Sequence, residues 1–152
     1  MQNAEEVMVE DVSTFHPEDD LSKVCNVFAE QGIRGAPVVN DDGKVVGVIT
    51  EHDINKLGRK HPELATSIKS HLVLALGLFR EEPYSEEVAD SLRELREKKV
   101  ADAMSTDVVT VPPDKGLDEL AKMMQKHEIN RIPIVDEEGK LLGLVAFIWG
   151  HA

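Results

Sequence analysis

The chain has 152 residues, of which 41% are hydrophobic and 30% charged, as in one folded domain or two small fused units that share a core. Its 29 acidic and 17 basic residues give a formal net charge of −12, so its overall field repels a nucleic-acid backbone. The longest apolar run, 72–79, is less than half of the roughly 20 residues that a membrane-spanning helix needs.

The cellular compartment is indicated by the N-terminus and by the cysteine content. Residues 1–6 are acidic, whereas a secretory signal begins with basic residues and continues with apolar ones. Cys25 is the single cysteine, which excludes an internal disulfide and indicates a reducing compartment. We therefore expect a cytoplasmic protein that binds neither nucleic acid nor membrane.

Most of the chain consists of two near copies of one pattern. Residues 32–48 are echoed by residues 128–144, and Pro37 and Pro133 are 96 residues apart. The same spacing relates Met8 to Met104 without a gap. Each copy predicts a strand, a helix, two strands and the start of a second helix, so the sequence predicts an α/β tandem repeat.

The first copy begins with a short β-branched strand at 12–15, followed by Pro17 and an amphipathic helix. The strands 36–39 and 44–49 follow, joined by a turn in which Gly43 supplies a positive φ. The helix presents an apolar face of Leu21, Val24, Cys25 and Phe28. We expect this face, including the cysteine, to lie in the core.

Residues 55–99 resemble neither copy and predict a helical insertion. An apolar stripe at helical spacing is followed by a charged helix that Ser85 can cap and that we expect to be solvated on its charged side. The stripe consists of Ile68, Leu72, Ala75, Leu76 and Phe79. Because the run is almost continuously apolar, we expect it to be covered on more than one side, with a partner subunit as one possible cover.

The second copy predicts strands at 108–111 and 140–145, and a helix between them with an apolar face. That face consists of Leu117, Leu120, Ala121 and Met124. Gly47 and Gly143 lie inside the last strand of each copy, where a missing side chain usually marks the close approach of a backbone or a ligand.

The stretch Gly47-Val48-Ile49-Thr50-Glu51-His52-Asp53 ends a strand and offers a hydroxyl and a carboxylate one helical turn apart. A Thr that caps a helix whose first turn contains an Asp is one interpretation. The other is a sugar site, in which the carboxylate accepts from ribose hydroxyls and the first N–H groups of the helix face a phosphate.

With these residues the chain resembles a tandem pair of cystathionine-β-synthase-type (CBS) domains, also called a Bateman module. The resemblance covers about residues 7–54 and 100–149. It implies two units packed around a pseudo-twofold axis, and two clefts that take adenosyl ligands such as AMP, ADP, ATP or S-adenosylmethionine. We divide the chain into a first repeat (1–54), a helical insertion (55–99) and a second repeat (100–152) without most of its closing helix.

The family signature Gly-h-h-Thr/Ser-x-x-Asp is matched by residues 47–53. The resemblance implies that Asp53 holds the ribose hydroxyls and that Thr50 lies by the ribose or phosphate. It also implies that the rest of this cleft comes from the second copy. Val108 and Val109 would line the adenine, Asn130 and Arg131 would face the phosphate, and Pro133 after them also belongs to the site. A guanidinium suits this role because it binds phosphate oxygens in a bidentate manner, although a surface Arg paired with a carboxylate is the alternative.

The second copy departs from the signature, since Ala146 and Trp149 stand where Thr50 and Asp53 stand in the first. Gly35 likewise occupies the position equivalent to Arg131. We therefore expect the second cleft to be empty, filled by Trp149 or used for a ligand other than a nucleotide.

Three classes of function follow, and the sequence favours the first. It is a non-enzymatic regulatory module, a homodimer that binds one adenosyl ligand per chain and acts on a separate protein. The second is a dimerisation module without a ligand, in which Thr50 and Asp53 only cap a helix. An enzyme is disfavoured because the six histidines have no metal-ligand spacing and no Ser or Cys lies beside a base in a recognisable motif, so we predict no bound metal.

Overall fold

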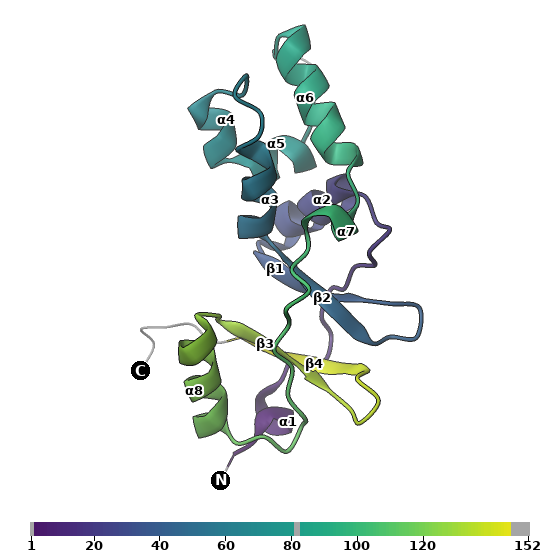
Figure 1. The fold of residues 1–152 in the computed structure, drawn as a ribbon, viewed down its shortest axis with the longest axis vertical. Coiled ribbons are helices and arrows are strands. Elements are labelled where there is room, and N and C mark those ends of the chain that lie inside the picture. The colour runs from purple at the N-terminus through teal and green to yellow at the C-terminus, as the bar shows by residue number, and fades with distance from the viewer. Residues whose placement is uncertain (1, 81–82, 147–152) are drawn as a thin grey trace.

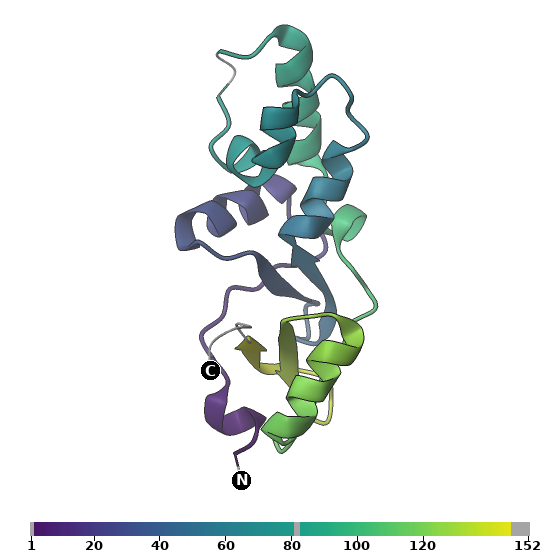
Figure 2. The same ribbon diagram turned by 90° about the vertical axis from the view of Figure 1, so that its left-hand side faces the viewer.

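The computed structural model describes residues 2–80 and 83–146, which form an elongated molecule of mixed helices and strands (Figure 1). Its elements are α1 (Ala4–Val7), α2 (Leu21–Gln31), β1 (Gly35–Val39), β2 (Val45–Thr50), α3 (Glu51–Gly58), α4 (Thr66–Ser70), α5 (Leu72–Gly77), α6 (Glu86–Glu97), α7 (Val100–Ala103), α8 (Leu117–His127), β3 (Arg131–Val135) and β4 (Leu141–Ala146). Helices α4, α5 and α6 form one end, the first repeat lies in the middle, and β3, β4 and α8 form the other end (Figures 1 and 2). No helix in the described ranges is long and apolar enough to cross a membrane.

Each repeat is built on an antiparallel hairpin whose register is the same in both copies. Gly35 pairs with Thr50 in the first hairpin, and Arg131 pairs with Ala146 in the second. The turn glycines Gly43 and Gly139 have φ values of 80° and 86°. The positive φ predicted for these turns is therefore confirmed.

The opening strands predicted at 12–15 and 108–111 do not form. Phe15 makes a single parallel bridge to Val38, and Val111 makes the equivalent bridge to Ile134. The Phe15 N–H donates to the Pro37 carbonyl at 3.2 Å, and the next bond of the ladder would need an N–H from Pro37. Proline has none, so the prolines that mark each repeat also limit its first segment to one bridge.

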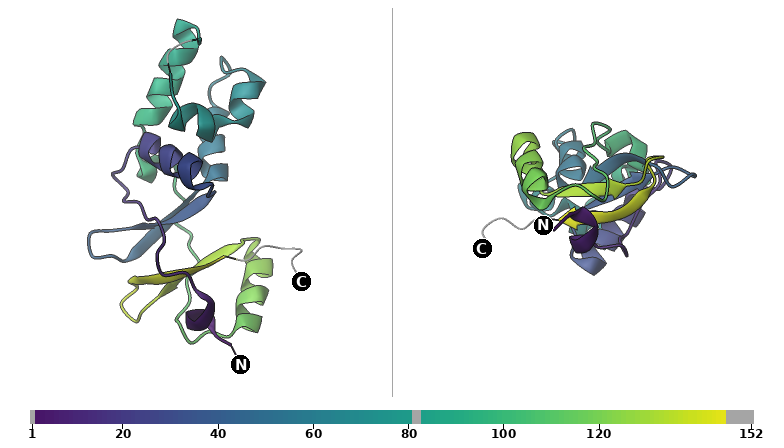
Figure 3. Two further views of the ribbon diagram at one scale, coloured as in Figure 1. Left: turned by 180° about the vertical axis from the view of Figure 1, so that it is seen from behind. Right: turned by 90° about the horizontal axis from the view of Figure 1, so that it is seen from below.

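The segment at the start of each repeat packs on the other repeat. Residues 8 and 9 lie along β4, where Val9 and Leu144 exchange two backbone hydrogen bonds of 2.9 Å. Ser105 and Val48 exchange the same pair of bonds, also at 2.9 Å, on β2. Figures 1 and 3 show α1 at the end of the molecule formed by the second repeat, and α7 packs against α3 at the other end of the first repeat's hairpin.

The strand glycines allow this exchange. A Cβ on Gly47 would lie 2.9 Å from the Ser105 carbonyl oxygen, and one on Gly143 would lie 2.9 Å from that of Val9. The close backbone approach that the sequence predicted at both positions is confirmed.

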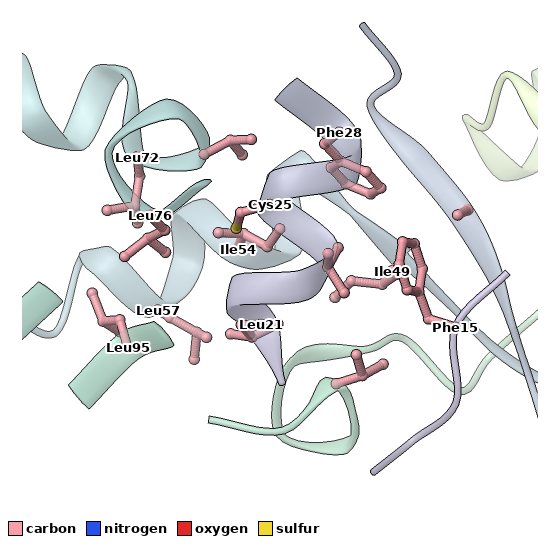
Figure 4. Close-up of a cluster of buried hydrophobic side chains, with 14 of the residues drawn as sticks. Phe15, Leu21, Cys25, Phe28, Ile49, Ile54, Leu57, Leu72, Leu76 and Leu95 are labelled. Carbon is pink, nitrogen blue, oxygen red and sulfur yellow. The ribbon is translucent and has the colours of Figure 1, made fainter. Parts of the chain in front are cut away.

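The larger core lies between the first repeat and the insertion. All four predicted α2 positions are buried, and Leu72 and Leu76 of α5 pack against them together with Ile54 and Leu57 of α3 and Leu95 of α6 (Figure 4). A smaller core in the second repeat contains Ala4, Val111, Leu120, Met124, Ile132, Ile134 and Val145. Leu117 and Ala121, predicted to be in that core, are only partly buried.

The insertion differs from the expected continuous apolar helix. His71 has non-helical angles (φ −129°, ψ 38°) and divides the stripe into α4 and α5. The Ser70 hydroxyl donates to the Thr66 carbonyl at 2.9 Å, so a side chain competes with the backbone for the first carbonyl of α4. The cover of Leu72 and Leu76 comes from α2, α3 and α6 of the same chain, while Leu74 and Leu78 remain exposed. Ser85 caps α6 as predicted, with the Val88 N–H 3.3 Å from its Oγ.

Burial of Cys25 leads to a prediction about its reactivity. The thiol is fully buried, and burial raises its pKa to about 12 from 9.0. At a given pH the native thiolate fraction is then roughly a thousandfold below that of an exposed thiol. We expect a thiol reagent at pH 8 to label the native protein only through unfolding and to label the urea-denatured protein at once. Fast labelling of the native protein would contradict this burial.

Candidate functional site

The helix α3 begins at a capping box formed by Thr50 and Asp53. The Asp53 N–H donates to Thr50 Oγ1 at 3.2 Å, and the Thr50 N–H donates to Asp53 Oδ2 at 3.0 Å. The Thr50 hydroxyl also donates to Oδ2, at 2.9 Å. The capping interpretation of this pair is therefore correct as local structure.

A third residue, which sequence reasoning missed, holds the other oxygen of this carboxylate. Ser105, in the segment that crosses from the second repeat, donates its hydroxyl to Asp53 Oδ1 at 3.0 Å. The sequence contained a signal for the pairing of Ser105 with Asp53. At the equivalent positions of the other copy stand Val9 and Trp149, neither of which can form this hydrogen bond. Both polar partners are therefore replaced together at the positions that correspond to the second cleft.

These contacts leave Asp53 able to accept a further hydrogen bond. The residue is 5% exposed, and Oδ2 already accepts from both the N–H and the hydroxyl of Thr50. Oδ1 accepts only from Ser105 in the described structure, which leaves one of its lone pairs free. A ligand hydroxyl can therefore bind Oδ1 without breaking the cap of α3.

The carboxylate borders a cleft of about 1110 Å³ between the repeats, which we call the Asp53 cleft. All seven predicted site residues line it: Thr50, Asp53, Val108, Val109, Asn130, Arg131 and Pro133. Several further residues line the cleft that were not predicted to belong to it, among them His52, Lys56, Ser105, Asp107, His127 and Glu128. The cleft therefore has apolar walls from the second repeat and mixed charge around them.

Arg131 is the first residue of β3 and is half-buried in this cleft. Burial alone lowers the pKa of its guanidinium, and its side chain forms no ion pair or hydrogen bond with the described residues. The alternative of a surface Arg paired with a carboxylate is therefore wrong for these residues, although the chain has 29 acidic side chains. A desolvated cation without a partner favours an anionic ligand.

The equivalent region of the second repeat has a different chemistry. Ala146 ends β4 opposite Arg131 and carries no hydroxyl to form a capping box. Trp149, the other residue predicted for this cleft, lies outside the described residues. Among the residues that are described, no group of three His, Cys, Asp or Glu side chains is placed to hold a metal ion.

Comparison with known proteins identifies the class to which this fold and cleft belong. The family model for the CBS domain matches residues 4–59 and 100–147, more than half of the chain. The chain therefore belongs to the CBS-domain family, with two copies of the domain in tandem. The predicted resemblance and the predicted α/β fold with paired repeats are both confirmed.

The relatives of this chain differ in how much of their own length the match covers. The uncharacterized protein MJ1426 of Methanocaldococcus jannaschii is 36% identical over 148 residues, which cover 94% of this chain and 88% of the relative. Inosine-5′-monophosphate dehydrogenase of the same organism is 28% identical over 145 residues, but these cover only 22% of the dehydrogenase. The match to that enzyme is thus confined to a minor part of its length.

Two solved structures share the fold. CBSX2 of Arabidopsis thaliana, in complex with AMP, has a TM-score of 0.68 and 19% identity, over 96% of this chain and 90% of CBSX2. The CBS domain pair of MJ0100, in complex with 5′-methylthioadenosine and S-adenosyl-L-methionine, has a TM-score of 0.64 and 19% identity, over 96% of this chain and 90% of that structure.

Proposed function

We propose that the chain is a regulatory module that binds one adenosyl ligand in the Asp53 cleft. The observation that carries this proposal is that one cleft contains both Asp53, with one free acceptor position, and Arg131, which has no partner among the described residues. A ribose hydroxyl donates to Asp53 Oδ1, and a phosphate or other anionic group faces Arg131. The AMP bound to CBSX2 and the adenosyl compounds bound to MJ0100 are ligands of this chemistry.

The remaining site residues have roles that follow from their place in the cleft. Val108 and Val109 supply an apolar wall for the adenine, next to the rigid Pro133. Asn130 offers an amide donor beside the sugar and phosphate, whereas the Thr50 hydroxyl already donates its hydrogen to Asp53 Oδ2 and offers the ligand an acceptor. Lys56, at the last turn of α3, adds a second cation for ligands with more than one phosphate.

In this proposal the module is not an enzyme, and its parts are a first repeat at 1–54, an insertion at 55–99 and a second repeat at 100–152. It acts as a homodimer in the cytoplasm on a separate protein, and a reducing compartment agrees with the free, buried Cys25. For regulation, the ligand has to bind one arrangement of the assembly more tightly than another.

The alternative is a structural module without a ligand. It is favoured by the capping box, which accounts for the presence of Thr50 and Asp53 without a nucleotide. The exposed Leu74 on α5 and Leu78 directly after it would then belong to a dimer contact.

Isothermal titration calorimetry with AMP, ADP, ATP and S-adenosylmethionine separates the two functions. The sensor proposal predicts saturable binding of at least one of them at one ligand per chain. Absence of heat from folded protein freed of copurified nucleotide would leave the structural module as the function.

Ser105 provides an additional test of the same site. Ser105→Ala removes the hydroxyl that holds Asp53 Oδ1, and we expect it to weaken the bound adenosyl ligand about threefold to tenfold. Thr106→Ala is a matched control because the neighbouring Thr106 is exposed and does not line the cleft. Equal affinities of the two variants in the titration would remove Ser105 from the site.

A further inference from the structure

Gly35 and Arg131 occupy equivalent positions in the two repeats, and the structure brings them into contact. Each is the first residue of its hairpin, in β1 and β3. A Cβ placed on Gly35 would lie 2.5 Å from Nη1, 2.7 Å from Cζ and 3.0 Å from Nε of Arg131. The guanidinium therefore occupies the space that any side chain at position 35 would need.

This contact places the cation beside the capping box. Gly35 is the cross-strand partner of Thr50 in the β1–β2 hairpin, and Thr50 holds Asp53. An Arg that lies against Gly35 is thus close to the segment that carries the carboxylate. The Arg131 side chain has no partner among the described residues. The position of its guanidinium therefore depends on the missing side chain of Gly35 and on the other residues that line the cleft.

We propose that Gly35 is a specificity-determining positioning residue, which lets the Arg131 guanidinium lie across β1 and so selects adenosyl ligands that carry a phosphate over those that do not. This inference rests on the proposed function, since it concerns the choice among ligands of the same cleft. The reason is geometric. A guanidinium binds phosphate oxygens through a planar fork, and a displacement of more than about an ångström removes that alignment.

The substitution that tests this role should leave the fold intact. Gly35 is not among the glycines with a positive φ, so an alanine fits its backbone conformation. The atoms that an added methyl would meet belong to the end of a flexible side chain, which can move aside. Gly35→Ala should therefore displace the Arg131 guanidinium rather than unfold β1.

The experiment is a calorimetric titration of AMP and of adenosine into four proteins: wild type, Gly35→Ala, Arg131→Ala and the double variant. We expect Gly35→Ala to weaken the binding of AMP about tenfold and the binding of adenosine less than about twofold. Because Gly35 acts through Arg131, the double variant should bind AMP no more weakly than Arg131→Ala alone. Gly116→Ala is the matched control, because the atom nearest to its added Cβ is at 3.9 Å and Gly116 does not line the cleft.

The outcomes separate this inference from the proposed function. An equal loss of AMP and adenosine in Gly35→Ala, or additive losses in the double variant, would overturn the role of Gly35 while leaving the adenosyl site in place. Failure of wild type to bind either compound would overturn the proposed function, and the selectivity with it. A selective, non-additive loss of AMP would support both.

Discussion

Asp53→Ala is expected to weaken AMP binding about tenfold to a hundredfold. A hydrogen bond to a charged group contributes about 1.5–3 kcal/mol, and the variant removes the carboxylate, itself only 5% exposed, that accepts from the ribose hydroxyl. Titration calorimetry of the variant against wild type measures the change. An unchanged affinity would show that the ligand, if one binds, does not use this carboxylate.

The control for this variant has to account for the cap. Asp53→Ala also removes the Thr50 N–H bond, and the loss of such a cap costs about 1 kcal/mol of folding stability. Asp102 caps α7 in the same way, accepting from the Lys99 N–H at 3.0 Å, but does not line the cleft. Asp102→Ala should therefore lose similar stability and keep full affinity, so a loss of affinity in both variants would trace the effect to folding.

Leu76→Ala is expected to lower the free energy of unfolding by about 2–5 kcal/mol. Leu76 is fully buried in α5 and packs in the core shared with α2, where the substitution leaves a cavity. Its carbonyl also accepts from Arg96 Nε at 2.9 Å, which joins α5 to α6. Urea denaturation followed by circular dichroism measures the shift of the transition midpoint.

Leu74→Ala on the same helix is the matched control. Leu74 is 47% exposed, so its truncation should change the free energy of unfolding by no more than about 0.5 kcal/mol. Equal effects of the two substitutions would contradict the shared core and would make the insertion a separate appendage of the first repeat.

The sequence predicted the repeated hairpins because their signals are local. Gly43 and Gly139 supply the positive φ that the turns require, and runs of mostly apolar residues flank these turns. The helix at 21–31 was equally predictable from the sequence, since its apolar face follows from helical spacing alone. The opening strands were overpredicted because β-branched residues at 12–15 suit a strand, whereas the missing N–H that limits their pairing belongs to Pro37.

The insertion was only partly predictable. Its apolar residues indicated burial, and Ser85 indicated the start of α6. The cover provided by α2 depends on packing between segments more than 40 residues apart, since Cys25 and Leu72 belong to the same core. Periodicity reports that a face is buried but not what buries it.

For the site, the sequence by itself determined the family, the signature from Gly47 to Asp53 and its absence in the second copy, because each is written in a short stretch or in a fixed repeat spacing. Only the tertiary structure decided that the first segments of the two repeats exchange, which brings Ser105 to Asp53, and that Arg131 lies against its own counterpart Gly35. These contacts join residues 52 and 96 positions apart. They arise from how the two repeats pack on each other, and no local propensity encodes such packing.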